Sequence, residues 1–191
     1  MQDNIPFWPQ ILNLLASGYL VQPDKAEFKP VLDFFAAADW PAIWPVEEKE
    51  SLQPLTSVLS AAVPATLYVE WQRLFMGPAA LPAPPWGSVW LDPEQVLNGD
   101  STLRLKTFLA REEMTLHGAE NEPVDHIGLM LLQAAWLAQE ERFEALQTLL
   151  SEHLMSWLPA FVETLKRAEP VSFYTALSEL TLLTVSAYCQ Q

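Results

Sequence analysis

The stretch GPAALPAPPWGSVWLD, residues 77–92, decides how this chain is organised. It contains four prolines, two tryptophans and two glycines, and it has no lysine, arginine or glutamate. Because proline removes backbone donors from helices and central strands, the stretch is predicted to be a loop. Trp86 and Trp90 are costly to leave in water. We therefore expect the loop to lie against the body, either as the wall of a peptide-binding groove or as a crossover whose tryptophans fill the core.

The length and composition predict one globular domain. The chain has 191 residues, 50% of them hydrophobic, which suits one sizeable core over residues 1–191. With 24 acidic and 10 basic residues, its net charge of −14 disfavours nucleic acid and anionic membranes as partners. The charge favours a cationic partner, although acidity also keeps an apolar-rich protein in solution.

The chain lacks sequence features of export, membrane insertion or disulfide formation. No lysine or arginine precedes Lys25, so neither a secretory signal nor a transit peptide is expected. The most apolar run, residues 127–138, is interrupted by Gln133 and is shorter than the roughly 20 residues of a membrane span. A single cysteine, Cys189, excludes an internal disulfide and fits a reducing cytoplasm.

Hydrophobic residues recur at helical spacing along most of the chain, and no segment shows the sustained alternation of a strand. The predicted helical segments are residues 7–19, 28–35, 52–59, 64–75, 101–111, 127–134, 143–154, 158–165 and 173–187, with a short turn of helix after Asp92. A polar linker is expected over residues 112–120. These patterns predict an all-α fold, an irregular bundle of about ten helical segments without internal repeats.

A second notable stretch, ENEPVDH at residues 120–126, precedes an apolar helix. In a purely structural interpretation the proline occupies the first turn, Asn121 caps the helix and Asp125 complements its positive end. In a functional interpretation the helix begins early, so that Glu122 stacks on His126 and Asn121 on Asp125. Carboxylates gathered in this way would suit guanidinium groups, which bind them through two parallel hydrogen bonds.

The sequence offers no catalytic or cofactor-binding constellation. The three histidines and Cys189 lack the spacing of a zinc site, so no metal is expected. The six glycines form no phosphate-binding loop. Ser88 lacks the glycine pattern and the preceding strand of a nucleophile elbow. We therefore expect a binding protein without a cofactor.

The segment from Tyr68 to Phe75, the proline-rich loop and the later pattern NEPxDHIG together resemble the TorD/DmsD family of redox-enzyme maturation chaperones. The likeness extends over essentially the whole chain and is most specific in the two motifs. The version WGSVWLD, residues 86–92, is similar to the DmsD branch, which serves dimethyl sulfoxide reductase.

The resemblance implies an all-helical cytoplasmic chaperone without enzymatic activity. Members of the family bind the twin-arginine leader of a molybdopterin-containing oxidoreductase subunit. They hold the leader until the cofactor is loaded and then release it to the twin-arginine (Tat) translocase. The implied partners are this leader and components of the Tat translocase.

The family's leader-binding positions correspond to apolar and polar residues of this chain. The apolar set is Trp71, Pro85, Trp86 and Trp90, and the polar set is Asn121, Glu122, Asp125 and His126. The chain departs from the family pattern at Ala79, where glycine is common, at Asn98, where an aromatic is common, and at Val124, where an acid is common. The last difference removes one charge from the expected site.

Two other functions are compatible with the sequence. An enzyme or a molybdenum-cofactor handler could use His126 and Asp125. An assembly factor could instead bind the folded body of a reductase and ignore its leader. Turnover or tight pterin binding would favour the first alternative, and capture of a leader-deleted reductase would favour the second.

Overall fold

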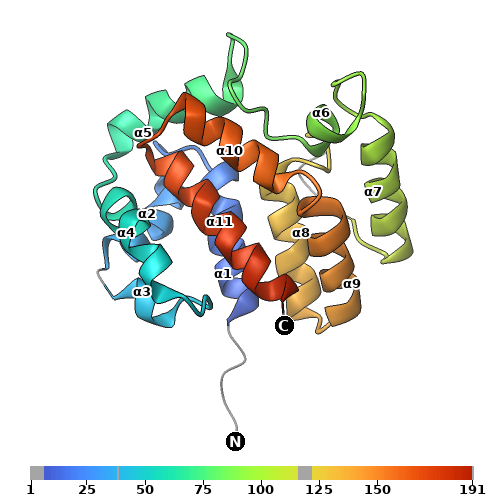
Figure 1. The fold of residues 1–191 in the computed structure, drawn as a ribbon, viewed down its shortest axis with the longest axis horizontal. Helices are drawn as coiled ribbons and strands as arrows, with labels where there is room; N and C mark the ends of the chain where they lie inside the picture. The colour runs from blue at the N-terminus through green and yellow to red at the C-terminus, as the bar shows by residue number, and fades with distance from the viewer. Residues whose placement is uncertain (1–6, 38, 116–121, 191) are drawn as a thin grey trace, which may run out of the picture. The chain divides into compact units, whose positions relative to one another are not determined.

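The regular secondary structure of the chain is helical. The computed structural model describes residues 7–37, 39–115 and 122–190, and within these ranges no strand occurs (Figure 1). The α-helices are α1 (Trp8–Leu20), α2 (Lys29–Ala36), α3 (Trp40–Ile43), α4 (Gln53–Ser60), α5 (Pro64–Trp71), α6 (Gly87–Leu91), α7 (Asp100–Arg111), α8 (Ile127–Gln139), α9 (Phe143–Thr148), α10 (Leu158–Ala168) and α11 (Phe173–Cys189). Four short 3₁₀ or π segments accompany them, namely η1 (Ala26–Phe28), η2 (Lys49–Leu52), η3 (Gln72–Met76) and η4 (Leu149–Leu154). The predicted all-α class is confirmed.

The chain divides into two compact units. The first comprises Met1–Ala16 and Pro85–Leu158, and the second comprises Ser17–Pro84 and Pro159–Gln191. Each has its own set of buried side chains. The organisation of residues 1–191 as a single domain stays a prediction.

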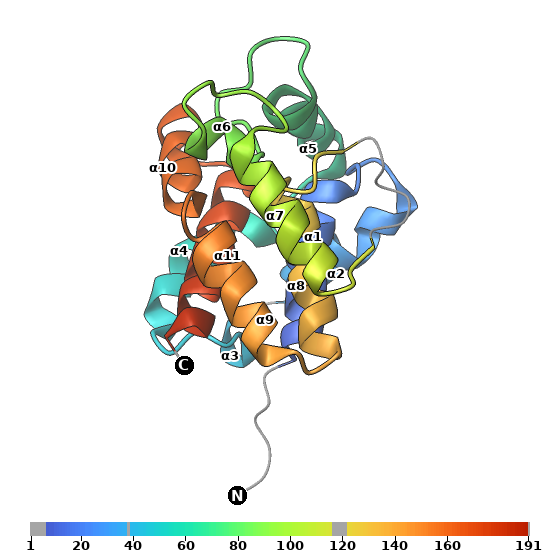
Figure 2. The same cartoon turned by 90° about the vertical axis from the view of Figure 1, so that its right-hand side faces the viewer.

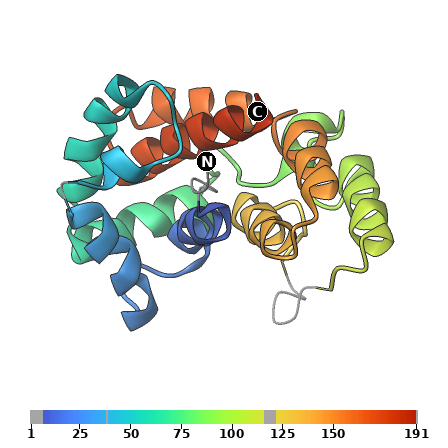
Figure 3. The same cartoon turned by 90° about the horizontal axis from the view of Figure 1, so that it is seen from below.

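The first unit is built around α8, which is apolar on nearly every side. Ten of its residues are buried, as expected of a central rather than an amphipathic helix. α8 contacts α9 and η4, and α6 contacts α7. Figures 2 and 3 show α7, α8 and α9 as neighbours in this part of the chain. Within this unit the start of α8 lies beside residues 85–87.

The second unit has an aromatic core. Trp40 packs edge to face against both Phe35 and Trp44, with ring centroids 5.4 Å and 5.3 Å away. The indole NH of Trp44 donates to the Thr184 hydroxyl at 2.9 Å. Pairing of the buried donor lets this tryptophan serve as core without leaving a polar atom unsatisfied.

Two local predictions were wrong, and a third was right only in part. The proline-rich stretch is not a loop throughout, because α6 forms directly after its last proline, where donors are available again. Residues 40–43 lie outside the predicted helical segments but form a short helix, α3, since proline is tolerated in a first turn. After Asp92 a single hydrogen-bonded turn forms, in which the Gln95 NH donates to the Asp92 carbonyl at 3.0 Å, but it does not continue as a helix, and Gln95 has φ 52°.

The described residues contain no single helix that is long and apolar enough to cross a membrane. One strongly bent pair, Lys49–Ser60 with Pro64–Met76 at 103°, meets the length and composition test together.

Candidate functional site

The end of the proline-rich stretch pairs with the residues that precede α8. Trp86 and His126 form an isolated antiparallel bridge. The Ile127 NH donates to the Pro85 carbonyl at 2.9 Å, and the Gly87 NH donates to the Asp125 carbonyl at 3.1 Å. These bonds bring together two segments about 40 positions apart in the sequence and fix both motifs as one structure.

Asp125 caps α6 from outside that helix. Its carboxylate oxygen Oδ2 accepts from the Ser88 NH at 2.7 Å and from the Thr102 hydroxyl at 3.0 Å. A carboxylate at a helix N-terminus satisfies orphan NH groups and complements the helix dipole. Asp125 is 3% exposed. Its second oxygen, Oδ1, has no hydrogen-bond partner among the described residues.

Asp92 provides an instructive comparison, because it is a buried capping aspartate of the same unit. Its carboxylate accepts from the Ser101 NH at 3.0 Å and from the Ser101 hydroxyl at 2.6 Å, using both oxygens. Asp92 is therefore satisfied by its role at the start of α7. Asp125 has the same role at α6 but retains unused acceptor capacity.

Trp86 and Glu122 join the apolar and acidic parts of the site. The half-buried Trp86 donates its indole NH to the Glu122 carboxylate. The Trp86 ring also meets the His126 imidazole edge to face, with centroids 5.9 Å apart. Trp86 is thus oriented by two polar side chains while part of its ring stays accessible.

His126 is the N-cap of α8. Its Nδ1 accepts from the Gly128 NH at 3.1 Å, which requires a neutral imidazole with its proton on Nε2. Burial lowers the pKa of His126 from 6.5 to about 4, in agreement with the neutral form. The cap is therefore His126, at a later position than the structural interpretation assigned to Asn121.

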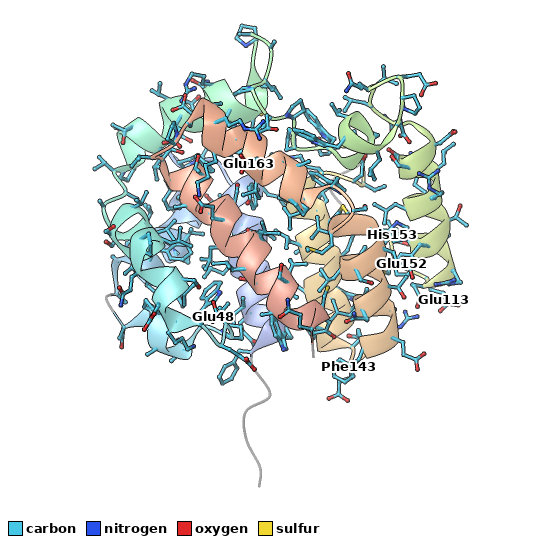
Figure 4. All side chains as sticks on the ribbon, viewed as in Figure 1. Glu48, Glu113, Phe143, Glu152, His153 and Glu163 are labelled. Atoms are coloured by element: carbon cyan, nitrogen blue, oxygen red, sulfur yellow. The ribbon has the colours of Figure 1, made fainter. Side chains whose placement is uncertain are left out.

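A cavity of about 250 Å³ borders this structure within the first unit. Its lining includes Asp125, Gly87, Trp157, Arg104, Glu152 and His153. Figure 4 shows Glu152 and His153 on η4. Burial lowers the pKa of His153, as it does for His126. The cavity thus combines tryptophan surface with a buried carboxylate that can accept further hydrogen bonds.

The described residues contain no group of three or more histidine, cysteine, aspartate or glutamate side chains placed to hold a metal ion.

Comparison with known proteins decides the family. The family model described as nitrate reductase delta subunit matches residues 44–163. The Tat proofreading chaperone DmsD of Salmonella typhi is 39% identical over 178 residues, covering 93% of this chain and 87% of the relative. The chaperone protein YcdY of Escherichia coli is 29% identical over 180 residues, covering 93% and 91%. The chain belongs to the TorD/DmsD family.

A solved structure shares the fold of this TorD/DmsD family member. It is a candidate redox enzyme maturation protein from Archaeoglobus fulgidus, similar with a TM-score of 0.61 at 19% identity over 100% of this chain and 94% of that one. The relatives are named chaperones. The family resemblance and the prediction of a chaperone rather than an enzyme are confirmed.

The structure brings together five of the residues that the family resemblance implies. Pro85 and Trp86 lie against Asp125 and His126 through the backbone pairing, and Glu122 binds Trp86. The early helix start was wrong, because residues 122–126 form a turn and α8 begins at Ile127. The carboxylates therefore gather through the pairing with residues 85–87 and not through stacking along a helix.

The remaining three predicted residues have different positions. Trp90 is half-buried on α6. Trp71 belongs to the second unit, where it is 6% exposed and donates its indole NH to the Tyr19 carbonyl at 3.2 Å. Asn121 lies outside the described residues. The leader-binding role of these residues stays a prediction.

Sequence reasoning missed two residues that build the site. Thr102 binds the Asp125 carboxylate from the first turn of α7, and Trp157 lines the cavity. Gly87 was quoted only as part of a motif, but a Cβ there would lie 2.9 Å from the Trp157 indole nitrogen. That close approach explains why glycine occupies this position, and no local pattern in the sequence indicates it.

Proposed function

We propose that the chain is a cytoplasmic chaperone that binds the twin-arginine leader of a molybdopterin oxidoreductase catalytic subunit, of the dimethyl sulfoxide reductase kind, before Tat export. Relatives named Tat proofreading chaperones support the general role. The net charge of −14 supports a cationic ligand.

The observation that carries the proposal is the unused acceptor of Asp125. A buried carboxylate oxygen without a partner is costly, so a native structure that retains one commonly uses it. A guanidinium entering the cavity of about 250 Å³ would donate to Oδ1 without disturbing the bonds at Oδ2. Glu122, held at Trp86, supplies a second carboxylate for the adjacent arginine.

The apolar part of a leader follows its arginine pair, and aromatic surface is available beside the carboxylates. Trp86 and Trp90 are half-buried, so each combines an anchored body with accessible ring surface. Pro85 is buried and its carbonyl is engaged by Ile127, which makes the backbone of this wall rigid. In the proposed complex these residues and His126 border the leader in a groove.

The experiment compares two buried capping aspartates. The affinity of a synthetic twin-arginine leader is measured by calorimetry for the wild type, Asp125→Asn and Asp92→Asn. Both variants are expected to lose stability, because each weakens a helix cap. Only Asp125→Asn is expected to lose leader affinity, by about tenfold or more.

Equal leader affinity in all three proteins at matched folded fractions would contradict the proposal. Undiminished capture of a leader-deleted reductase, together with no leader binding, would favour the assembly-factor alternative.

A further inference from the structure

A second surface of the first unit lies where α7 and α8 end and α9 begins. It consists of two neighbouring hollows, which we call the α7–α9 groove. One hollow, of about 490 Å³, is lined by Glu113, Met114, Leu132, Trp136 and Gln139 among others. The other, of about 660 Å³, is lined by Glu112, Glu141, Arg142, Phe143 and Glu144 among others. Neither hollow shares a lining residue with the Asp125 cavity.

Large apolar side chains are exposed along this groove. Leu132 is 37% exposed, Trp136 38% and Phe143 53%. Single exposed apolar residues are ordinary, but three around two neighbouring hollows form the kind of patch that marks an interaction site. Figure 4 shows Phe143 at the start of α9 and Glu113 at the end of α7, which bound the patch.

The two arginines of the groove are already engaged. Arg142 donates to the Glu112 carbonyl at 2.6 Å and to the Glu112 carboxylate, and its guanidinium lies 5.7 Å from the centre of the Trp136 ring. Arg111 forms an ion pair with the same Glu112 at 3.2 Å. Arg142, which lines the second hollow, therefore lies against Trp136, which lines the first, and the Glu112 carboxylate is ion-paired with both arginines.

Three further glutamates that line the hollows, Glu113, Glu141 and Glu144, are exposed and form no ion pair among the described residues. Glu140, next to Glu141 in the chain, is also exposed and without an ion pair there. The charges of Glu113, Glu140 and Glu141 are unfavourable where they stand, because these residues follow the C-terminal ends of α7 and α8, where the helix dipole is negative. Glu144 instead lies in the first turn of α9, where the dipole favours a carboxylate. The groove is thus apolar at its centre and acidic at its rim.

Two of these glutamates also have a backbone conformation that favours glycine. Glu113 has φ 53° and Glu141 has φ 55°. Each is the left-handed residue of a Schellman motif, as shown by the bonds from the Met114 NH to the Leu109 carbonyl and from the Arg142 NH to the Leu137 carbonyl, both 2.9 Å. Glycine would be more stable at both positions, so stability does not account for these carboxylates.

We infer that the α7–α9 groove is a docking site for a basic amphipathic helix of a protein partner, separate from the leader site. The apolar face of the helix lies on Trp136, Leu132 and Phe143, and its lysines or arginines meet the unpaired glutamates of the rim. Charge complementarity selects this occupant, because the acidic rim would repel an acidic helix and a second copy of this strongly acidic chain. The inference goes beyond leader binding and does not depend on it.

The test uses a defined probe, a Leu/Lys amphipathic helical peptide of about 18 residues, long enough to hold a helix on the groove. Its affinity is measured by calorimetry at low and physiological salt, and a twin-arginine leader peptide is titrated separately. The variant Glu113→Gln/Glu141→Gln is expected to bind the probe on the order of tenfold more weakly at low salt, with a smaller loss at high salt. The matched control is Glu27→Gln/Glu48→Gln, which removes two exposed glutamates of the second unit that form no ion pair among the described residues; Figure 4 labels Glu48. It is expected to bind like the wild type.

A second pair of variants separates binding from folding. Glu113→Gly/Glu141→Gly is expected to melt at a higher temperature and yet to bind the probe more weakly. Gln95→Gly, at another left-handed position with φ 52°, is expected to raise the melting temperature without changing probe affinity. Trp136→Ala/Phe143→Ala is expected to abolish probe binding and leave leader affinity unchanged.

Several results would overturn the inference. One is equal loss of probe affinity in the groove and control glutamine variants, which would reduce the effect to net charge. Another is competition between leader and probe for one site. A third is self-association of the wild type that Trp136→Ala/Phe143→Ala removes, which would assign the groove to a second copy. If the wild type bound the helical probe but not the leader peptide, the proposed function would be contradicted and this inference would stand.

Discussion

The indole NH of Trp86 donates a hydrogen bond to the Glu122 carboxylate, which ties the tryptophan at the end of the proline-rich stretch to the acidic turn before α8. The backbone bridge between Trp86 and His126 holds the same two segments together. Trp86 therefore offers an apolar ring surface and also holds the Glu122 carboxylate in place. In the proposed complex, the arginines and the apolar segment of a leader meet at this contact.

Replacing Trp86 tests the aromatic wall. Trp86→Ala is expected to weaken leader binding by about 1–3 kcal/mol, as expected for a half-buried aromatic anchor. It is expected to cost only about 1 kcal/mol of stability, because the backbone bonds of Pro85 and Gly87 persist. Trp86→Phe keeps an aromatic ring and loses the donor to Glu122, so its binding should be intermediate. A stability loss of about 3–5 kcal/mol with unchanged affinity would instead identify Trp86 as core.

Trp71 is expected to respond in the opposite way. Its indole is 6% exposed and donates to the Tyr19 carbonyl, so Trp71→Phe should lower stability by about 1–3 kcal/mol. Leader affinity at matched folded fractions should stay the same. Denaturant titration and calorimetry on one preparation measure both quantities. Weaker leader binding without a change in stability would identify Trp71 as a direct contact.

Stability is expected to fall as the pH falls through the titration of His126. Burial lowers its pKa from 6.5 to about 4 in the folded state, so the unfolded chain binds the proton first. The resulting loss of stability between pH 7 and pH 5 is about 2 kcal/mol, and the loss continues until the pH is well below the folded-state pKa of about 4.

His126→Asn isolates this effect, because asparagine keeps an N-cap acceptor and does not titrate. The variant should lose about 2 kcal/mol less than the wild type over the same pH range, in urea titrations at each pH. His153, whose pKa is also lowered by burial, contributes in the same direction, and His153→Gln removes that part. Parallel pH dependence in the wild type and His126→Asn would show that His126 is not buried as a neutral group.

Much of the fold follows from local patterns. Helical spacing of apolar residues located the long helices, and Pro64 and Gly77 mark the start of α5 and the end of η3. α6 was missed because the prolines before it dominate the composition of residues 77–92, although none occurs after Pro85. A short helix that depends on a distant carboxylate for its cap carries little signal of its own.

Several residues of the candidate site could be named from the sequence, but their arrangement could not. Pro85, Trp86, Asp125 and His126 were implied by a family likeness, but the backbone pairing that joins them spans about 40 positions and has no local signature. Neighbouring elements supply Thr102, through its hydrogen bond to Asp125, and Trp157, through its close packing against Gly87. Long-range contacts of this kind become visible only in the folded chain.

The central claim is that Glu122 and Asp125 receive the two arginines of a leader. Arginine pairs two donors with one carboxylate, whereas lysine offers a point charge, so an Arg-Arg to Lys-Lys exchange keeps the charge and removes the geometry. The direct test is a double-mutant cycle by calorimetry, combining that exchange in the leader with Glu122→Gln/Asp125→Asn in the chaperone, at two salt concentrations. The account predicts a coupling free energy of about 1–3 kcal/mol that persists at high salt. Effects that add to within about 0.5 kcal/mol would contradict it and would place the arginine pair elsewhere on the acidic surface.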